Sequence, residues 1–175
     1  GSLALDGVSL SVAAGSCHGL VGENGAGKST LGKILAGIHQ ADGGEMRVFG
    51  RSVAFRSPAE ALASGIALVH QELSFCENMS VAENLLLGRL PRVGPFVSRR
   101  RLATEARRLL AEIAPEVPVD RRLGELSVSQ QQLVQIAGAI ARGARIIIFD
   151  EPTSSLSDRE AQRLHALVRD LVSRG

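Results

Sequence analysis

The sequence predicts an α/β fold in which a mostly parallel sheet is flanked by helices and carries an inserted all-helical subdomain. Short apolar runs that are typical of strands alternate with helical patterns through residues 1–73. Helical patterns alone fill residues 74–142, and an apolar strand pattern returns at 145–150. Because a parallel sheet is covered by helices on both faces, we expect these strands to be buried.

The composition is that of one globular domain. The chain has 175 residues, of which 45% are hydrophobic and 22% are charged. Its net charge of +2 is small, and the arginine cluster at 99–101 has no interleaved aromatic residues, so we expect no nucleic-acid partner. No apolar run has the length needed to cross a bilayer.

Two strands are expected near the beginning of the chain. Residues 8–12 alternate apolar and polar side chains, as a half-buried strand does, and residues 17–22 form an apolar run that ends at glycine. Cys17 lies in the second run, and Cys17 and Cys76 show no CxxC spacing. We therefore expect Cys17 to be a small, reduced core residue.

The next four elements alternate between helix and strand. Residues 29–37 carry apolar side chains at helical spacing and end at Gly37, a suitable cap. A strand is expected at 45–50, after a turn of two glycines. Residues 57–63 open with serine and proline, the pattern of a helix N-terminus, and residues 66–71 indicate a further buried strand.

Helices dominate the rest of the chain. A capping-box sequence opens a helical stretch at 80–87, and the glycine and prolines of 91–96 break the chain. A charged amphipathic helix is expected at 99–113. Further helices are expected at 129–141 and, after a serine cap, through 172.

The segment GENGAGKS at 22–29 matches the phosphate-loop pattern GxxxxGK[ST] and lies between a strand and a helix. Glycines let backbone N–H groups curl around phosphate oxygens, and a helix N-terminus adds partial positive charge. Lys28, one of only two lysines, is a compact charge suited to the β- and γ-phosphates, and Ser29 offers a hard oxygen to Mg²⁺. The expected nucleotide-binding residues are Gly22, Glu23, Asn24, Gly25, Ala26, Gly27, Lys28, Ser29 and Thr30.

Two acids follow the buried strand at 145–149. A carboxylate at the end of a parallel strand lies at the edge where such sheets bind ligands. Asp150 is expected to hold Mg²⁺ through water, and Glu151 to orient or deprotonate the attacking water. Taken alone, an acidic strand end is more often a solvated loop. The phosphate loop in the same chain favours the functional interpretation.

Three further segments resemble motifs of ATP-binding cassette (ABC) ATPases. LSVSQ at 126–130 resembles the family signature LSGGQ, and Gln71 resembles the glutamine of the Q-loop. EPTSSLS at 151–157 resembles the segment that holds the catalytic glutamate and the D-loop. The motifs keep the family's order over nearly the whole chain. The resemblance implies a P-loop NTPase-type fold that binds ATP and Mg²⁺ and hydrolyses ATP.

The resemblance also implies roles for individual residues. Gln71 would join Glu151 in catalysis and would join Ser29 and Asp150 in binding Mg²⁺. The residues implied to contact ATP held by another cassette are Ser127, Val128, Ser129 and Gln130. Two of these depart from the family pattern, because valine and serine replace the two signature glycines. The aspartate of the D-loop is Ser157 here, with an aspartate one place later.

Several stretches, including VGENGAGKSTL and GIALVHQELS, are similar to the first cassette of ATPases that drive import of ribose, galactose or xylose. This similarity implies a second cassette, arranged head to tail, in the same parent polypeptide. It also implies a transmembrane permease and, indirectly, a periplasmic or extracellular sugar-binding protein. The expected location is peripheral, at the cytoplasmic face of the cell's inner membrane. The sugar itself is not encoded in this chain.

The predicted domain organisation has three parts. Residues 1–73 and 143–175 form the ATP-binding core, and residues 74–142 form the helical signature subdomain. The family's adenine-stacking aromatic and switch histidine are expected beyond the two ends of this chain. We therefore expect a cassette that is incomplete at both ends and, alone, hydrolyses little ATP.

Two alternatives to sugar import remain open. One is a soluble ABC-type ATPase that acts on ribosomes or in DNA repair, although the long charged inserts of such proteins are not seen. The other is a regulatory nucleotide-binding module without turnover. Glu151 argues against this module, and the departures at Val128 and Ser129 favour it slightly.

Overall fold

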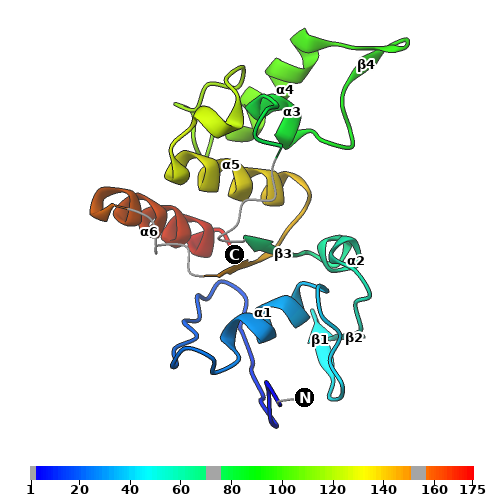
Figure 1. Ribbon diagram of the computed structural model, residues 1–175, viewed down its shortest axis with the longest axis vertical. Coiled ribbons are helices and arrows are strands. Elements are labelled where there is room, and N and C mark those ends of the chain that lie inside the picture. The colour runs from blue at the N-terminus through cyan, green and yellow to red at the C-terminus, as the bar shows by residue number, and fades with distance from the viewer. Residues whose placement is uncertain (1–2, 70–75, 151–156) are drawn as a thin grey trace.

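The computed structural model of the protein describes residues 3–69, 76–150 and 157–175 (Figure 1). The described helices are α1 Lys28–Leu35, α2 Pro58–Ala63, α3 Val81–Leu85, α4 Arg99–Leu110, α5 Val128–Ala141 and α6 Asp158–Ser173, with a 3-10 turn, η1, at Leu123–Glu125. The described strands are β1 Met46–Val48, β2 Arg51–Val53, β3 Ile66–Val69, β4 Arg92–Val93, β5 Phe96–Val97 and β6 Ile146–Phe149.

The centre of the fold is the parallel pair of β3 and β6, which joins segments on either side of the helical region. Side chains of β6 alternate between two apolar clusters, as the period of a strand requires. Ile146 and Ile148 pack with the cluster around Phe55, and Ile147 packs with the cluster around Leu164. Both faces of the pair are therefore covered, as expected for buried parallel strands.

Helices lie on both faces of this pair (Figure 1). Helix α1 packs below it, where a Cβ added to Gly32 would lie 3.6 Å from Cγ2 of Ile148. Helices α5 and α6 pack above it, and the buried Ile136 and Leu164 belong to the same apolar cluster there. The helix that follows the phosphate loop and the helix that follows the signature segment thus lie on opposite faces.

The helical region has its own apolar core, built from α3, α4, α5 and the segment between α4 and α5. Asn84 in α3 is buried and organises the entry to this region: its side chain accepts a hydrogen bond from the N–H of Cys76 and donates to the carbonyls of Cys76, Met79 and Ser80. A buried amide with this many partners fixes the local backbone at little cost. None of the described helices combines the length and apolar character that a membrane crossing needs.

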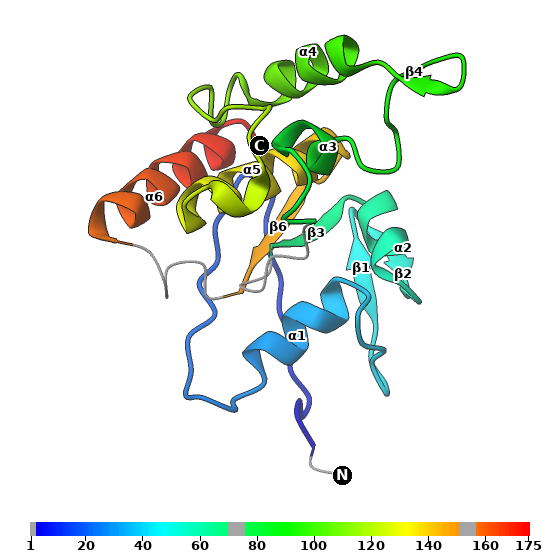
Figure 2. The ribbon, with the colours of Figure 1, turned by 45° about the horizontal axis from the view of Figure 1, so that its top comes forward.

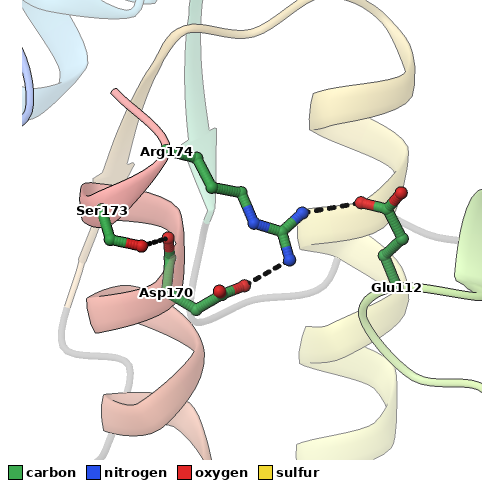
Figure 3. A network of polar contacts seen from close by, with 4 residues as sticks. All are labelled: Glu112, Asp170, Ser173 and Arg174. Atoms are coloured by element: carbon green, nitrogen blue, oxygen red, sulfur yellow. Dashed lines mark hydrogen bonds and ion pairs between the residues drawn. The ribbon is translucent and has the colours of Figure 1, made fainter.

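One surface network links α6 to the helical region (Figure 3). The guanidinium of Arg174 lies 2.6 Å from a carboxylate oxygen of Glu112, which follows α4, and 2.6 Å from one of Asp170 in α6. The Ser173 hydroxyl donates to the carbonyl of Asp170. All the charged groups are exposed, so the network adds little stability and mainly fixes orientation.

The two strands predicted near the beginning of the chain are wrong. Residues 8–12 and 17–22 form no strand, and no described residue pairs with them in a ladder. Their apolar side chains are exposed, and Cys17 is exposed rather than in the core. An apolar pattern indicates which residues would be buried in a strand, but the strand itself needs a hydrogen-bonding neighbour.

Most other predicted elements are confirmed with shifted ends. The strand predicted at 45–50 ends at Val48, because Phe49 (φ 48°) and Gly50 (φ 79°) form the turn into β2. The break predicted at 91–96 contains β4 and the first residue of β5, which pair as a hairpin. The helix predicted at 99–113 ends at Leu110.

Candidate functional site

The phosphate loop approaches α1 through a tight turn. The N–H of Ala26 donates to the carbonyl of Glu23, and Gly27 has a positive φ of 87° immediately before the helix. A Cβ on Gly27 would lie 2.5 Å from the carbonyl oxygen of Ala4 and 2.8 Å from Cδ2 of Leu5, so only glycine fits there. The cap residue is Gly27, so no side chain caps the first N–H groups of α1. These groups can therefore donate to an anion.

Lys28 lies folded across its own loop. Its Nζ atom donates hydrogen bonds of 2.7 Å to the carbonyl of Gly22 and 2.8 Å to the carbonyl of Glu23. A flexible stem with one compact charge can make both contacts and can later exchange them for phosphate oxygens. The lysine is thus held at the loop in a position to meet the ligand that the loop would bind.

Ser29 connects the phosphate loop to the acidic strand end. Its Oγ donates a hydrogen bond of 2.9 Å to Oδ1 of Asp150. Asp150 is placed by β6, because its N–H donates to the carbonyl of Val69 and extends the parallel ladder by one residue. Two motifs predicted separately are therefore in direct contact at the carboxyl end of the β3–β6 pair.

A hydroxyl and a carboxylate in contact are hard oxygen donors of the kind that Mg²⁺ prefers. Among the residues that the structure describes, no three His, Cys, Asp or Glu side chains gather into a closed metal cage. Mg²⁺ needs no such cage, because it keeps several waters and binds one or two protein oxygens together with phosphate oxygens. Ser29 and Asp150 therefore fit Mg²⁺ that arrives with a nucleotide.

The signature segment forms the N-terminus of α5. Ser127 is the cap: its Oγ accepts a hydrogen bond from the N–H of Gln130, and Oε1 of Gln130 accepts one from the N–H of Ser127. The helix therefore begins at Val128, one residue earlier than the predicted start at Ser129, because Ser127 caps it. Val128 is 43% exposed, and the two serine hydroxyls lie 3.0 Å apart.

A cavity of about 320 Å³ adjoins the signature segment. Side chains from α5, α6 and the loop before η1 line it, including Glu116, Ser127, Ser129, Gln130, Arg163 and Leu164. Sequence reasoning missed Glu116 and Arg163. Glu116 lies in an irregular loop and Arg163 on a helix with many charges, so neither gave a signal in the sequence.

The predicted site residues are only partly brought together. The phosphate loop, Ser29 and Asp150 form one group. The signature segment begins α5, which packs on the face of the parallel pair opposite to α1. Gln71 and Glu151 lie outside the described residues, so their predicted roles stay predictions.

Comparison with known proteins places these features in a family context. The sequence profile described as ABC transporter matches residues 5–154. An arabinose import ATP-binding protein, AraG 1, of Burkholderia cenocepacia is 52% identical over all 175 residues. A putative ribose/galactose/methyl galactoside import ATP-binding protein of the same species is 47% identical over the same length. The chain spans 35% and 34% of these relatives' lengths, about a third.

Solved structures of ATP-binding cassettes from ABC transporters are also similar to this chain. A nucleotide-free ATP-binding cassette from an ABC transporter is similar with a TM-score of 0.82 and 30% identity, covering 98% of this chain and 72% of that one. An ATP-binding cassette in its ADP conformation is similar with a TM-score of 0.81, 31% identity and the same coverage. These similarities confirm the predicted α/β fold class.

Proposed function

The chain belongs to the ABC transporter family, and from this premise we propose that it is part of the ATP-hydrolysing subunit of a sugar importer. The observation that carries the proposal is the hydrogen bond from Ser29 to Asp150. It joins the phosphate loop to the strand end where Mg²⁺ would be bound and the attacking water activated. The import names of relatives 47% to 52% identical over the whole chain support the choice of a sugar.

ATP would bind with its phosphates in the loop at 22–30. Lys28 would exchange its two carbonyl partners for oxygens of the β- and γ-phosphates, and the N–H groups at the start of α1 would donate to the same phosphates. Mg²⁺ bound by Ser29 and, through water, by Asp150 would neutralise charge on the phosphates. Gln71 would add a further oxygen to that site.

Hydrolysis needs a base next to this group. Glu151 follows Asp150 directly, so its carboxylate would accept a proton from the water that attacks the γ-phosphorus, with ADP leaving. Gln71 would help to orient the water. These two roles rest on the motif positions in the sequence.

A second cassette would complete the site. Within one chain, α1, which follows the phosphate loop, and α5 pack on opposite faces of the β3–β6 pair. Helix α5 begins with the segment of Ser127, Val128, Ser129 and Gln130. A γ-phosphate on the loop would therefore meet the signature of another cassette, arranged head to tail. ATP would join the two halves and its hydrolysis would release them, because ADP lacks the bridging phosphate.

The ATPase subunit would lie peripherally at the cytoplasmic face of the cell's inner membrane. The proposed partners are a transmembrane permease and, through it, a periplasmic or extracellular sugar-binding protein. Closure of the two cassettes would change the shape of the permease. This part of the proposal rests on the names of the relatives and on the family.

Uptake by living cells tests the proposal. Cells that lack the full-length protein should lose uptake of one labelled sugar among arabinose, ribose, galactose and xylose. Wild-type protein should restore it, whereas Lys28→Ala should not. Unchanged uptake of all four sugars in the deleted cells would contradict the assignment to this class of importer.

A further inference from the structure

The hairpin of β4 and β5 protrudes from the helical region and ends in apolar side chains. Both views show it extending away from the rest of the chain beside α4 (Figure 1 and Figure 2). Phe96 is 76% exposed, Val93 is 56% exposed and Val97 is 41% exposed. With the turn residues between the strands, they form five consecutive positions without a polar side chain, VGPFV. An exposed apolar tip of this kind is unusual on a protein surface.

Arginines surround this tip. We call residues 89–101, RLPRVGPFVSRRR, the basic hairpin: it holds five arginines and no acid. The whole chain has a net charge of +2, so the residues outside this segment carry a net charge of −3. The net positive charge of the chain therefore comes from the segment that carries the apolar tip.

The arrangement is not explained by the stability of α4. Three arginines, Arg99, Arg100 and Arg101, occupy the first turn of this helix, and no acid accompanies them. Cations near a helix N-terminus oppose the helix dipole, and acids are the favoured residues there. A pattern that works against its own helix indicates an external partner with negative charge.

Few of the described acidic side chains pair with the arginines of the basic hairpin. In the described part of the chain, Arg92, Arg100 and Arg101 form no ion pair, whereas Arg107 on the same helix lies 3.3 Å from Asp120. Arg99 attracts Glu83 at longer range, and it adds to the lowering of the pKa of Glu83 that is caused first by hydrogen bonds from Ser80. The positive charges remain available to a ligand.

We propose that the basic hairpin is a docking site for an anionic phospholipid bilayer, in which the apolar tip enters the interface and the arginines contact lipid phosphates. Apolar groups flanked by cations are the pattern of interfacial membrane binding. The backbone of the tip suits an apolar environment, because Val93 and Phe96 are paired across the strands and Pro95 has no N–H to satisfy. An acidic protein segment would use the arginines but would leave Phe96 and Val93 without a role.

The proposal does not depend on the nucleotide site, and it is tested on the full-length protein without nucleotide. The measurement is co-sedimentation with vesicles of phosphatidylglycerol and phosphatidylcholine, with pure phosphatidylcholine vesicles for comparison. Binding should require phosphatidylglycerol and weaken with salt. Phe96→Ser should reduce binding at least about tenfold, and Phe96→Trp should retain it.

A matched pair of double variants separates the basic hairpin from general positive charge. Arg100→Gln with Arg101→Gln should weaken binding roughly 25-fold, at about fivefold for each arginine. Arg107→Gln with Arg108→Gln removes the same charge from the same helix and should change binding less than twofold. Circular dichroism and ATPase turnover should be unchanged in all variants, since none of these residues belongs to the nucleotide site.

Three results would overturn the proposal. The first is no binding to vesicles that contain phosphatidylglycerol. The second is equal loss of binding in the two double variants. The third is tight binding to soluble polyglutamate that Phe96→Ser leaves unchanged, which would instead identify the basic hairpin as a contact for an acidic protein segment.

Discussion

The hydroxyl of Ser29 donates a hydrogen bond of 2.9 Å to the carboxylate of Asp150, across 121 positions of sequence. The contact places the phosphate loop beside the end of β6. It brings together the Ser29 oxygen that would bind Mg²⁺ and the Asp150 carboxylate that would hold the ion through water. We expect Asp150→Asn in the full-length protein to remove the gain in ATP affinity that Mg²⁺ provides, because the amide lacks the charge that a cation needs. The measurement is ATP affinity in Mg²⁺ and in a chelator.

Asp42→Asn is the matched control, since Asp42 is exposed in the loop between α1 and β1. This variant should keep the wild-type ratio of the two affinities. If Asp150→Asn also kept that ratio, Asp150 would have no part in the metal site.

Glu151 is expected to act as the base. Glu151→Gln in the full-length protein should keep ATP affinity within a few-fold and lower turnover by about a hundredfold or more, because the amide cannot accept the proton of water. Glu105→Gln, an exposed position on α4, should turn over normally. A Glu151→Gln protein that turned over ATP within a few-fold of wild type would exclude this role.

Ser127 combines a structural role with its proposed contact to ATP, and two substitutions separate them. Ser127→Ala removes the cap of α5 and should lower the free energy of unfolding by about 1 kcal/mol. Ser127→Asp restores a good cap but places a negative charge where the γ-phosphate of the second cassette would lie. It should therefore unfold like the wild type in urea and yet lose most turnover. Full activity with aspartate would show that Ser127 is only a cap.

Glu83 makes part of the stability of the helical region depend on pH. The Ser80 hydroxyl and N–H both donate to its carboxylate and lower its pKa below the ordinary value of 4.5. The carboxylate's contribution is therefore complete above the unfolded-state pKa and is lost as the pH falls through the lower pKa of the folded state. Glu83→Gln should be less stable than wild type at neutral pH, and urea unfolding should show the difference disappearing below pH 4.5. A difference that did not change with pH would contradict this assignment.

Motifs that depend only on residues close together in the sequence were predictable. The phosphate loop, the cap at Ser57 and the capping box at Ser80 each depend on residues a few positions apart, and the structure has all three caps or turns where expected. The helix predicted at 129–141 is also present, and it begins one residue earlier, at Val128.

Features that depend on distant partners were not predictable. Residues 17–22 have the apolar pattern of a buried strand, but no described segment pairs with them, and Cys17 is exposed as a result. Residues 91–96 are predicted only as a break, because glycine and proline do not indicate which flanking residues will pair. The contact between Ser29 and Asp150 followed only from assuming that both motifs serve one ligand.

The central claim is that the loop at 22–30 binds the phosphates of ATP, and Lys28 tests it most directly. The only other lysine of the chain, Lys33, lies on α1 outside the loop and gives a matched control. Calorimetric titration of the full-length protein with ATP and Mg²⁺ should show affinity lowered at least about tenfold by Lys28→Ala and unchanged by Lys33→Ala, because a charge-assisted contact to phosphate is lost only in the first. Near-normal ATP affinity in Lys28→Ala would contradict the phosphate-loop assignment and the function built on it.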